Sequence, residues 1–166
     1  MKSMKGILAG ILALVLALCV GLVGCAEKQQ EEKESAFAVV SDGVSVELGA
    51  DAKEVLNALG ESQAQQEVFD CGAGNSRMYY RYGSLDLYTM KTGEGETVDQ
   101  IDLKDDLATT SRGICIGDTL AKVKEAYGNP SAEEEGQLTY SKDGKHLVFR
   151  VSDGTVTGIS LIRKTA

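Results

Sequence analysis

The strongest constraint on the fold of this chain is a stretch of sequence that it repeats. Residues 46–60 read VELGADAKEVLNALG, and residues 114–128 read ICIGDTLAKVKEAYG. With the two stretches aligned 68 positions apart, four identities result: Gly49 with Gly117, Val55 with Val123, Ala58 with Ala126, and Gly60 with Gly128. Each stretch predicts a short strand, a glycine, a capped helix and a closing glycine, so the chain is expected to contain one structural unit twice.

Apolar spacing and end signals support a helix in both stretches. In the second, apolar residues recur at helical spacing, and either Asp118 or Thr119 can accept hydrogen bonds from the first free N–H groups. In the first, Asp51 begins what resembles a capping box. Gly60 and Gly128 can adopt the left-handed conformation that ends a helix. Each helix has only about nine residues, too few for stability alone in water, so each must lie on an apolar surface.

Alternating segments separated by turns follow both helices. Asp143-Gly144 and Asp153-Gly154 divide the end of the chain, and Asp-Gly is a strong hairpin signal. The expected strands cover 78–82, 85–90, 98–103, 138–140, 147–151 and 156–162, with a hairpin near Phe37 before the first helix. The sequence therefore predicts an α+β fold of two tandem repeats, residues 37–112 and 113–166. Each repeat is expected to pack a short helix on a three- to four-stranded antiparallel sheet.

The N-terminus has the pattern of an export signal. Lys2 and Lys5 precede an apolar run from Ile7 to Gly24, and the run ends in Leu22-Val-Gly-Cys25. This ending resembles the lipobox of bacterial lipoproteins, which implies a signal peptide over residues 1–24 and a diacylglyceryl group on Cys25. An uncleaved membrane-spanning helix is the alternative, because 18 apolar residues nearly span a bilayer. Residues 25–36 then read as a flexible, charged spacer. We expect a chain anchored to the lipid bilayer at the outer face of the bacterial cell membrane, of the Gram-positive type.

The charge balance narrows the choice of partner. Cleavage before Cys25 would remove two lysines and no acids, leaving 15 basic and 25 acidic residues and a net charge of −10. Such an acidic chain is not expected to bind nucleic acid or an anionic lipid surface. The acidic run Glu133–Glu135 is expected to be a solvated loop.

Two cysteines remain for disulfide chemistry after export and lipidation. Cys71 and Cys115 lie one in each repeat, in a compartment that permits disulfides. A bridge between them would close a loop of about 44 residues and contribute roughly 4 kcal/mol to stability. Two free thiols are the alternative, and the sequence leaves both open.

No catalytic or metal-binding pattern stands out. A lone histidine, His146, cannot build a multi-histidine metal site, and no motif for a serine nucleophile or a phosphate-binding loop is complete. Acidic residues crowd one strand end without matching an EF-hand; they are Asp99, Asp102, Asp105 and Asp106. We therefore predict a non-enzymatic protein without cofactor or metal.

Alternation along the strands divides each sheet into two faces. One set is expected to face the helices: Tyr80, Tyr82, Leu85, Leu87, Leu138, Tyr140, Leu147 and Phe149. The other set is expected to face away: Tyr79, Arg81, Tyr88, Met90, His146, Val148 and Arg150. Tyrosine, arginine and methionine are typical of protein-binding surfaces, so the second set is the candidate site. Alternatively, the other repeat or the Phe37 hairpin covers this face.

The order of these elements resembles a known family. A glycine, a short helix with a valine, a second glycine, a tyrosine strand, an apolar strand and a final Val-x-x-Ile strand are similar to the β-lactamase-inhibitor-like superfamily. That group includes tandem-repeat inhibitors and SmpA/OmlA-type lipoproteins, and the chain also looks similar to lipoproteins of anaerobic Gram-positive bacteria. The resemblance implies an α+β fold that acts by protein–protein contact. The first copy departs from the pattern, since Glu61-Ser62 stands where the second copy has a proline.

Two functional hypotheses follow. The first is a membrane-anchored, non-enzymatic module that binds another protein of the cell envelope or outside the cell. The second is a receptor for a small ligand, such as a peptide, a sugar or a cell-wall fragment, held in a pocket between the repeats.

Overall fold

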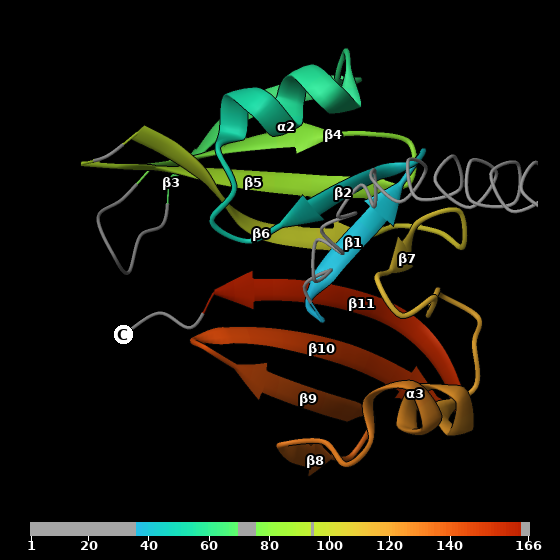
Figure 1. Ribbon diagram of the computed structural model, residues 1–166. Coiled ribbons are helices and arrows are strands. Elements are labelled where there is room, and N and C mark those ends of the chain that lie inside the picture. Colours follow the sequence, from blue (N-terminus) through green and yellow to red (C-terminus); the bar gives the residue numbers. More distant parts are fainter. Residues whose placement is uncertain (1–35, 70–75, 94, 164–166) are drawn as a thin grey trace, which may run out of the picture. The chain divides into compact units, whose positions relative to one another are not determined.

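The structure is a computed structural model that describes residues 36–69, 76–93 and 95–163 (Figure 1). The predicted signal peptide, the spacer up to residue 35, Cys25 and Cys71 lie outside these residues. The chain divides into two compact units, and all that follows concerns the second, Glu34–Ala166. Its apolar core is drawn from residues 36 onward, so this unit contains a core of its own. Among the described residues, no helix is long and apolar enough to span a bilayer.

Antiparallel strands and two short helices make up the described residues. The helices are α2 (Ala52–Leu59) and α3 (Leu120–Tyr127). The strands are β1 (Ala38–Ser41), β2 (Val44–Glu47), β3 (Ala64–Phe69), β4 (Ser76–Arg81), β5 (Leu85–Thr92), β6 (Gly95–Leu103), β7 (Thr109–Thr110), β8 (Ala132–Glu134), β9 (Gln137–Lys142), β10 (Lys145–Ser152) and β11 (Thr155–Arg163). They form a three-stranded sheet, β2-β1-β7, and an eight-stranded sheet, β3-β4-β5-β6-β11-β10-β9-β8. The predicted α+β class is confirmed.

The large sheet differs from the expected pair of separate sheets. The strands that follow α2 and those that follow α3 join where β6 pairs with β11, with Ile101 opposite Leu161 and Leu103 opposite Ile159. The last strand of each segment therefore lies at the centre, and the first, β3 or β8, lies at an outer edge. Joining the two segments buries an apolar flank that a unit of about 60 residues could not cover alone.

A row of apolar side chains runs through the six inner strands of the large sheet. In order across the sheet, the row contains Tyr80, Leu87, Ile101, Leu161, Leu147 and Tyr140. All six belong to one core cluster, together with Val55 of α2 and Val123 of α3. All eight side chains expected to face the helices are in this cluster, which confirms that prediction. Both helices therefore bury their inward valine against the same side of the sheet.

The small sheet covers the core on that same side. Phe37, Val39, Val46 and Leu48 belong to the core cluster, so the predicted hairpin is confirmed but does not cover the opposite face. Ser41 of β1 and Ser84 share a buried hydrogen bond of 2.7 Å between their hydroxyl oxygens, which ties the small sheet to the turn before β5.

Equivalent backbone bonds tie each helix to the large sheet. Before α2, the Gly49 N–H donates to the Val98 carbonyl at 2.8 Å, and the Val98 N–H donates to the Ala50 carbonyl at 3.0 Å. Before α3, the Gly117 N–H donates to the Val156 carbonyl at 2.8 Å, and the Val156 N–H donates to the Asp118 carbonyl at 2.8 Å. Gly49 and Gly117 have φ angles of 86° and 94°, values that side chains with a Cβ rarely adopt.

The ends of both helices follow the predicted signals. The Asp51 carboxylate accepts from the Glu54 N–H at 3.0 Å, and the Thr119 hydroxyl accepts from the Lys122 N–H at 3.2 Å. Of the two candidate caps, Thr119 is therefore the one used. Gly60 and Gly128 end the helices with φ angles of 79° and 75°.

Three local predictions need correction. Residues 114–116 form no strand, although Ile114 is fully buried; β7 lies just before them, and the Thr110 N–H donates to the Ile114 carbonyl. β3 was missed, because its sequence, AQQEVF, lacks apolar alternation. The acidic run Glu133–Glu135 was expected to be a loop, but Glu133 and Glu134 belong to the exposed edge strand β8, which pairs with β9. Both edge strands owe their conformation to the neighbouring strand rather than to their own composition.

We expect Ile101→Ala to destabilise the protein by about 2–5 kcal/mol, because it opens a cavity between Leu87 and Leu161 at the centre of the sheet. Urea unfolding followed by circular dichroism measures the change. Leu107→Ala, at a side chain that is 77% exposed, is the control and should shift stability by less than about 0.5 kcal/mol. Two separate transitions in the wild type would contradict a shared core.

Candidate functional site

The open face of the large sheet is the side opposite the helices and the small sheet, and all seven predicted site residues lie on it. Strand register shows this directly, since Tyr88, Gln100, Ile162 and His146 stand in one row across β5, β6, β11 and β10. A second row contains Asp86, Asp102, Ser160 and Val148. Tyr79 lies opposite Tyr88, Arg81 opposite Asp86, Met90 opposite Arg77, and Arg150 opposite Gly158.

A polar cluster on β4, β5 and β6 organises one half of the open face. The Tyr79 hydroxyl donates to the Asp86 carboxylate at 2.9 Å, and the Arg81 Nε donates to the Tyr79 hydroxyl oxygen at 2.9 Å. The Lys104 ammonium lies 3.0 Å from Asp86, so one largely buried carboxylate holds a tyrosine and two cations. The Asp86 side chain is only 10% exposed, whereas that of Arg81 is 54% exposed. The face therefore presents cations to solvent above a buried acid.

Tyr88 lies beside this cluster and is held by its neighbours. Its ring centroid is 5.2 Å from that of Tyr79, and the Arg77 guanidinium carbon is 5.2 Å from its centroid. Burial raises the pKa of Tyr88, and the carboxylates of Asp102 and Asp86 raise it further. The phenol therefore stays neutral at physiological pH and can serve as a flat contact surface.

Arg77 extends the cluster toward one end of β6. Its Nη1 lies 3.2 Å from the Asp99 carboxylate and donates to the Gln100 side-chain oxygen at 3.2 Å. Its buried Nε has no hydrogen-bond partner within the part of the chain that the structure describes. Gln100 in turn donates to Asp102 at 2.7 Å.

The other half of the open face is smaller and less connected. The His146 Nδ1 and the Ser141 hydroxyl share a hydrogen bond of 2.7 Å. The Val148 side chain, on β10, is half-buried. The Arg150 guanidinium lies over Gly158, where a Cβ would meet its Nε at 2.8 Å. β5 and β10 are separated by β6 and β11, a distance of about 14 Å at ordinary strand spacing. The structure therefore brings Tyr79, Arg81, Tyr88 and Met90 together, and His146, Val148 and Arg150 form a second group.

Sequence reasoning missed several members of this face. They are Arg77, Asp86, Gln100, Asp102, Lys104 and Ile162. Strand alternation places Arg77 and Asp86 on the same side as Tyr79 and Tyr88. The contacts of Lys104 and Ile162, however, depend on the register between strands and on the β6–β11 pairing, which no local pattern encodes.

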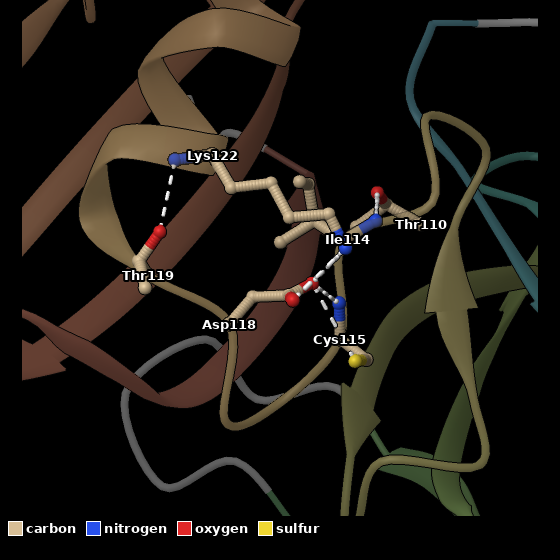
Figure 2. Close-up of polar contacts among 6 residues, drawn as sticks. All are labelled: Thr110, Ile114, Cys115, Asp118, Thr119 and Lys122. Carbon is tan, nitrogen blue, oxygen red and sulfur yellow. Dashed lines mark hydrogen bonds and ion pairs between the residues drawn. The ribbon is translucent and has the colours of Figure 1, made fainter.

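The loop before α3 holds the one cysteine among the described residues (Figure 2). The Asp118 carboxylate accepts from the Cys115 N–H at 2.9 Å and from its thiol at 3.5 Å, and Lys122 Nζ lies 2.8 Å away. Burial raises the pKa of the Cys115 thiol, and the bond to Asp118 raises it further, against the effect of Lys122. Burial also acts to raise the pKa of Asp118, but the bonds from Lys122 and Cys115 outweigh it and hold that pKa low. A protonated, half-buried thiol is a poor nucleophile.

Pairing of Cys115 with Cys71 stays a prediction, because Cys71 lies outside the described residues. Three of the four acidic residues considered for calcium have separate surroundings: Asp99 pairs with Arg77, Asp102 accepts from Gln100, and Asp105 accepts from the Leu107 N–H. Within the described ranges, no three histidine, cysteine or acidic side chains gather to hold a metal ion.

Two shallow hollows lie beside α2, on the covered side of the sheet. The larger, of about 350 Å³, lies among Leu56, Gly60, Ser62, Gln65, Tyr80 and Tyr82. The smaller, of about 240 Å³, lies between the first turns of α2 and Glu96. Neither includes a residue that follows β6, so neither is the expected pocket between repeats.

We expect Asp118→Asn to lower the pKa of the Cys115 thiol, because it removes the carboxylate that raises it. The alkylation rate at neutral pH should rise, since the thiolate is the reactive form. The measurement is iodoacetamide labelling of residues 26–166 across a pH series in the Cys71→Ser background, where Cys115 is the one remaining thiol. Lys122→Met is the matched variant and should raise the pKa of the Cys115 thiol, because it removes the cation that lowers this pKa. Equal pKa values in all three proteins would contradict the assignment.

Comparisons with protein-family models, with curated proteins and with solved structures find no match to this chain.

Proposed function

We propose that this chain is a membrane-anchored, exported lipoprotein that acts by binding another protein of the cell envelope or outside the cell. The observation that carries the binding proposal is the open face, where tyrosine and arginine side chains are held in place by a hydrogen-bonded network. Tyrosine and arginine dominate the energetics of protein interfaces. Side chains that are already ordered lose less conformational entropy when a partner binds.

Tandem repetition is the second part of the proposal. The backbone bonds that tie Gly49 to Val98 and Gly117 to Val156 support it, because they join equivalent positions of the two segments. The strand order supports it as well, since each segment runs from an outer edge to the centre of the sheet. Duplication would give the protein one wide recognition face instead of two narrow ones. The resemblance to the β-lactamase-inhibitor-like superfamily agrees with recognition by a sheet face, without assigning a target.

Attachment to the outer face of the membrane through Cys25 is the third part, and it rests on the lipobox-like sequence. Two acyl chains anchor a protein far more firmly than one, at about 0.8 kcal/mol per buried methylene. The charged spacer would then hold the folded unit away from the lipid surface. The small-ligand receptor remains the alternative, and it needs a pocket at the junction of the repeats.

We expect Cys25→Ser to abolish incorporation of labelled fatty acid in growing cells and to leave the protein as an unprocessed precursor. The wild type should migrate as the shorter, labelled form in the membrane fraction. Incorporation of label into Cys25→Ser would contradict lipidation at this residue, and an unlabelled wild type would favour the uncleaved membrane helix.

We expect Arg81→Ala combined with Tyr88→Ala to weaken partner binding at least about tenfold, because both side chains extend from the ordered cluster. The partner is first identified by chemical cross-linking in intact cells, and its affinity for the purified protein is then measured. Lys53→Ala is the matched control, an exposed residue of α2 on the covered side, and should bind like the wild type. Unchanged affinity of the double variant, with an unchanged melting temperature, would place recognition elsewhere.

A further inference from the structure

The two edges of the large sheet are protected to different degrees. β8 is three residues long, carries Glu133 and Glu134, and follows Pro130 closely. Short length, charge and proline are devices that prevent an edge strand from pairing with another chain. β3 has six residues, AQQEVF, with one charge and neither proline nor glycine.

β3 is open along its length. It pairs with β4 on one side and ends the strand order on the other, so half of its backbone N–H and C=O groups point outward. Five of its six side chains are exposed, from Ala64 to Glu67 and Phe69. Nothing in the described part of the chain adds a strand to this edge.

Phe69 gives the edge an apolar anchor. Its side chain is 72% exposed, and only one other large apolar side chain, Leu107, is comparably exposed among the described residues. Phe69 lies opposite Ser76, and the register places it on the same side of the sheet as Tyr80, the side that carries α2. The hollow of about 350 Å³ lies on that side, at the other end of β3, bordered by Ser62 and Gln65.

We infer that two copies of this chain associate through β3, and that the two β3 strands pair antiparallel about Gln66. Phe69 of each copy then enters the hollow of about 350 Å³ beside α2 of the other copy. A twofold axis through Gln66 sets Gln65 opposite Glu67 of the second copy and Ala64 opposite Val68. Each Glu67 then avoids its counterpart, whereas an axis at Glu67 would set two carboxylates opposite each other. Phe69 of the second copy falls opposite Gln63, between Ser62 and Gln65, at the border of the hollow.

The size of this contact determines its strength. Six residues from each copy and two phenyl rings bury less than the roughly 1,200 Å² of stable complexes. The association is therefore weak and reversible, and it joins two eight-stranded sheets into one. Because the twofold axis lies perpendicular to the sheet, the open faces of both copies point the same way. The inference does not depend on what the open face binds.

A charge-swap experiment tests the twofold axis. Gln66 is exposed, and Gln66→Glu and Gln66→Lys each set two like charges opposite each other at the axis. Sedimentation velocity on residues 26–166, which include the complete core, measures self-association from about 1 µM to about 1 mM. We expect the wild type to dimerise, each variant alone to be at least about tenfold weaker, and their equimolar mixture to regain the wild-type level. A wild type that stays monomeric, or a mixture as weak as its components, overturns the proposal; the first result would leave an extended segment of another protein as the occupant of the edge.

A matched pair of variants, Phe69→Ala and Leu107→Ala, tests the contact that Phe69 makes with the second copy. Phe69→Ala should weaken the dimer at least about tenfold without changing the melting temperature, since the side chain is exposed in the monomer. Leu107→Ala, at the other exposed apolar residue, should dimerise like the wild type. Equal dimer constants for both variants overturn the insertion of Phe69.

Cross-linking in cells tests the same axis in the full-length chain. Gln66→Cys in the Cys71→Ser background places two thiols at directly opposite positions, where antiparallel Cα atoms lie about 4.5–5.5 Å apart. This distance permits a disulfide. We expect an oxidant-dependent dimer for Gln66→Cys and none for Glu133→Cys on β8. Equal yields from both strands would overturn pairing through β3.

Discussion

The pairing of β6 with β11 is the constraint on which the rest of this structure depends. It aligns Ile101 with Leu161 and so makes one apolar row out of two shorter ones, from Tyr80 to Tyr140. Either helix on its own sheet of a few strands would be marginally stable, because a unit of that size leaves much of its apolar surface in water. With the sheet joined, Val55 and Val123 bury against the same core.

The open face follows from this arrangement. The small sheet and both helices cover one side of the large sheet. On the opposite side, polar side chains are partly buried and therefore need hydrogen-bond or charge partners. Neighbouring strands provide these partners: Asp86 holds Tyr79, Arg81 and Lys104, and Arg77 bridges Asp99 and Gln100. The Asp86 carboxylate is surrounded by donors, and the Arg81 and Lys104 side chains around it stay partly in solvent. The surface is thus polar and internally hydrogen-bonded, in a chain whose overall charge is negative.

Local signals predicted the local structure well. The Asp-Gly turns have the left-handed φ values expected, 50° and 72° at Asp143-Gly144 and 51° and 73° at Asp153-Gly154. Strand alternation also assigned each predicted side chain to the correct face. What the sequence could not provide was long-range pairing, which depends on surfaces formed by distant segments. β3 and β8 form strands although they lack strand-forming composition. Residues 114–116 have that composition but form no strand, because no partner strand pairs with them. Equally, the link between Lys104 and Asp86 arises from cross-strand register, not from spacing along the chain.

The order of strands across the large sheet has a consequence for how the protein matures. The centre of the sheet is formed by the last strand of each segment. Ile101 is therefore covered on its β11 side only when Leu161, about 60 positions later in the chain, pairs with it. Contacts between such distant residues form slowly, because a long loop must close before they contribute. A chain exported unfolded, N-terminus first, could pair β6 with β5 early, but the other edge of β6 would stay without its partner β11 until the last residues emerge. Completion of the fold would then be coupled to completion of transport.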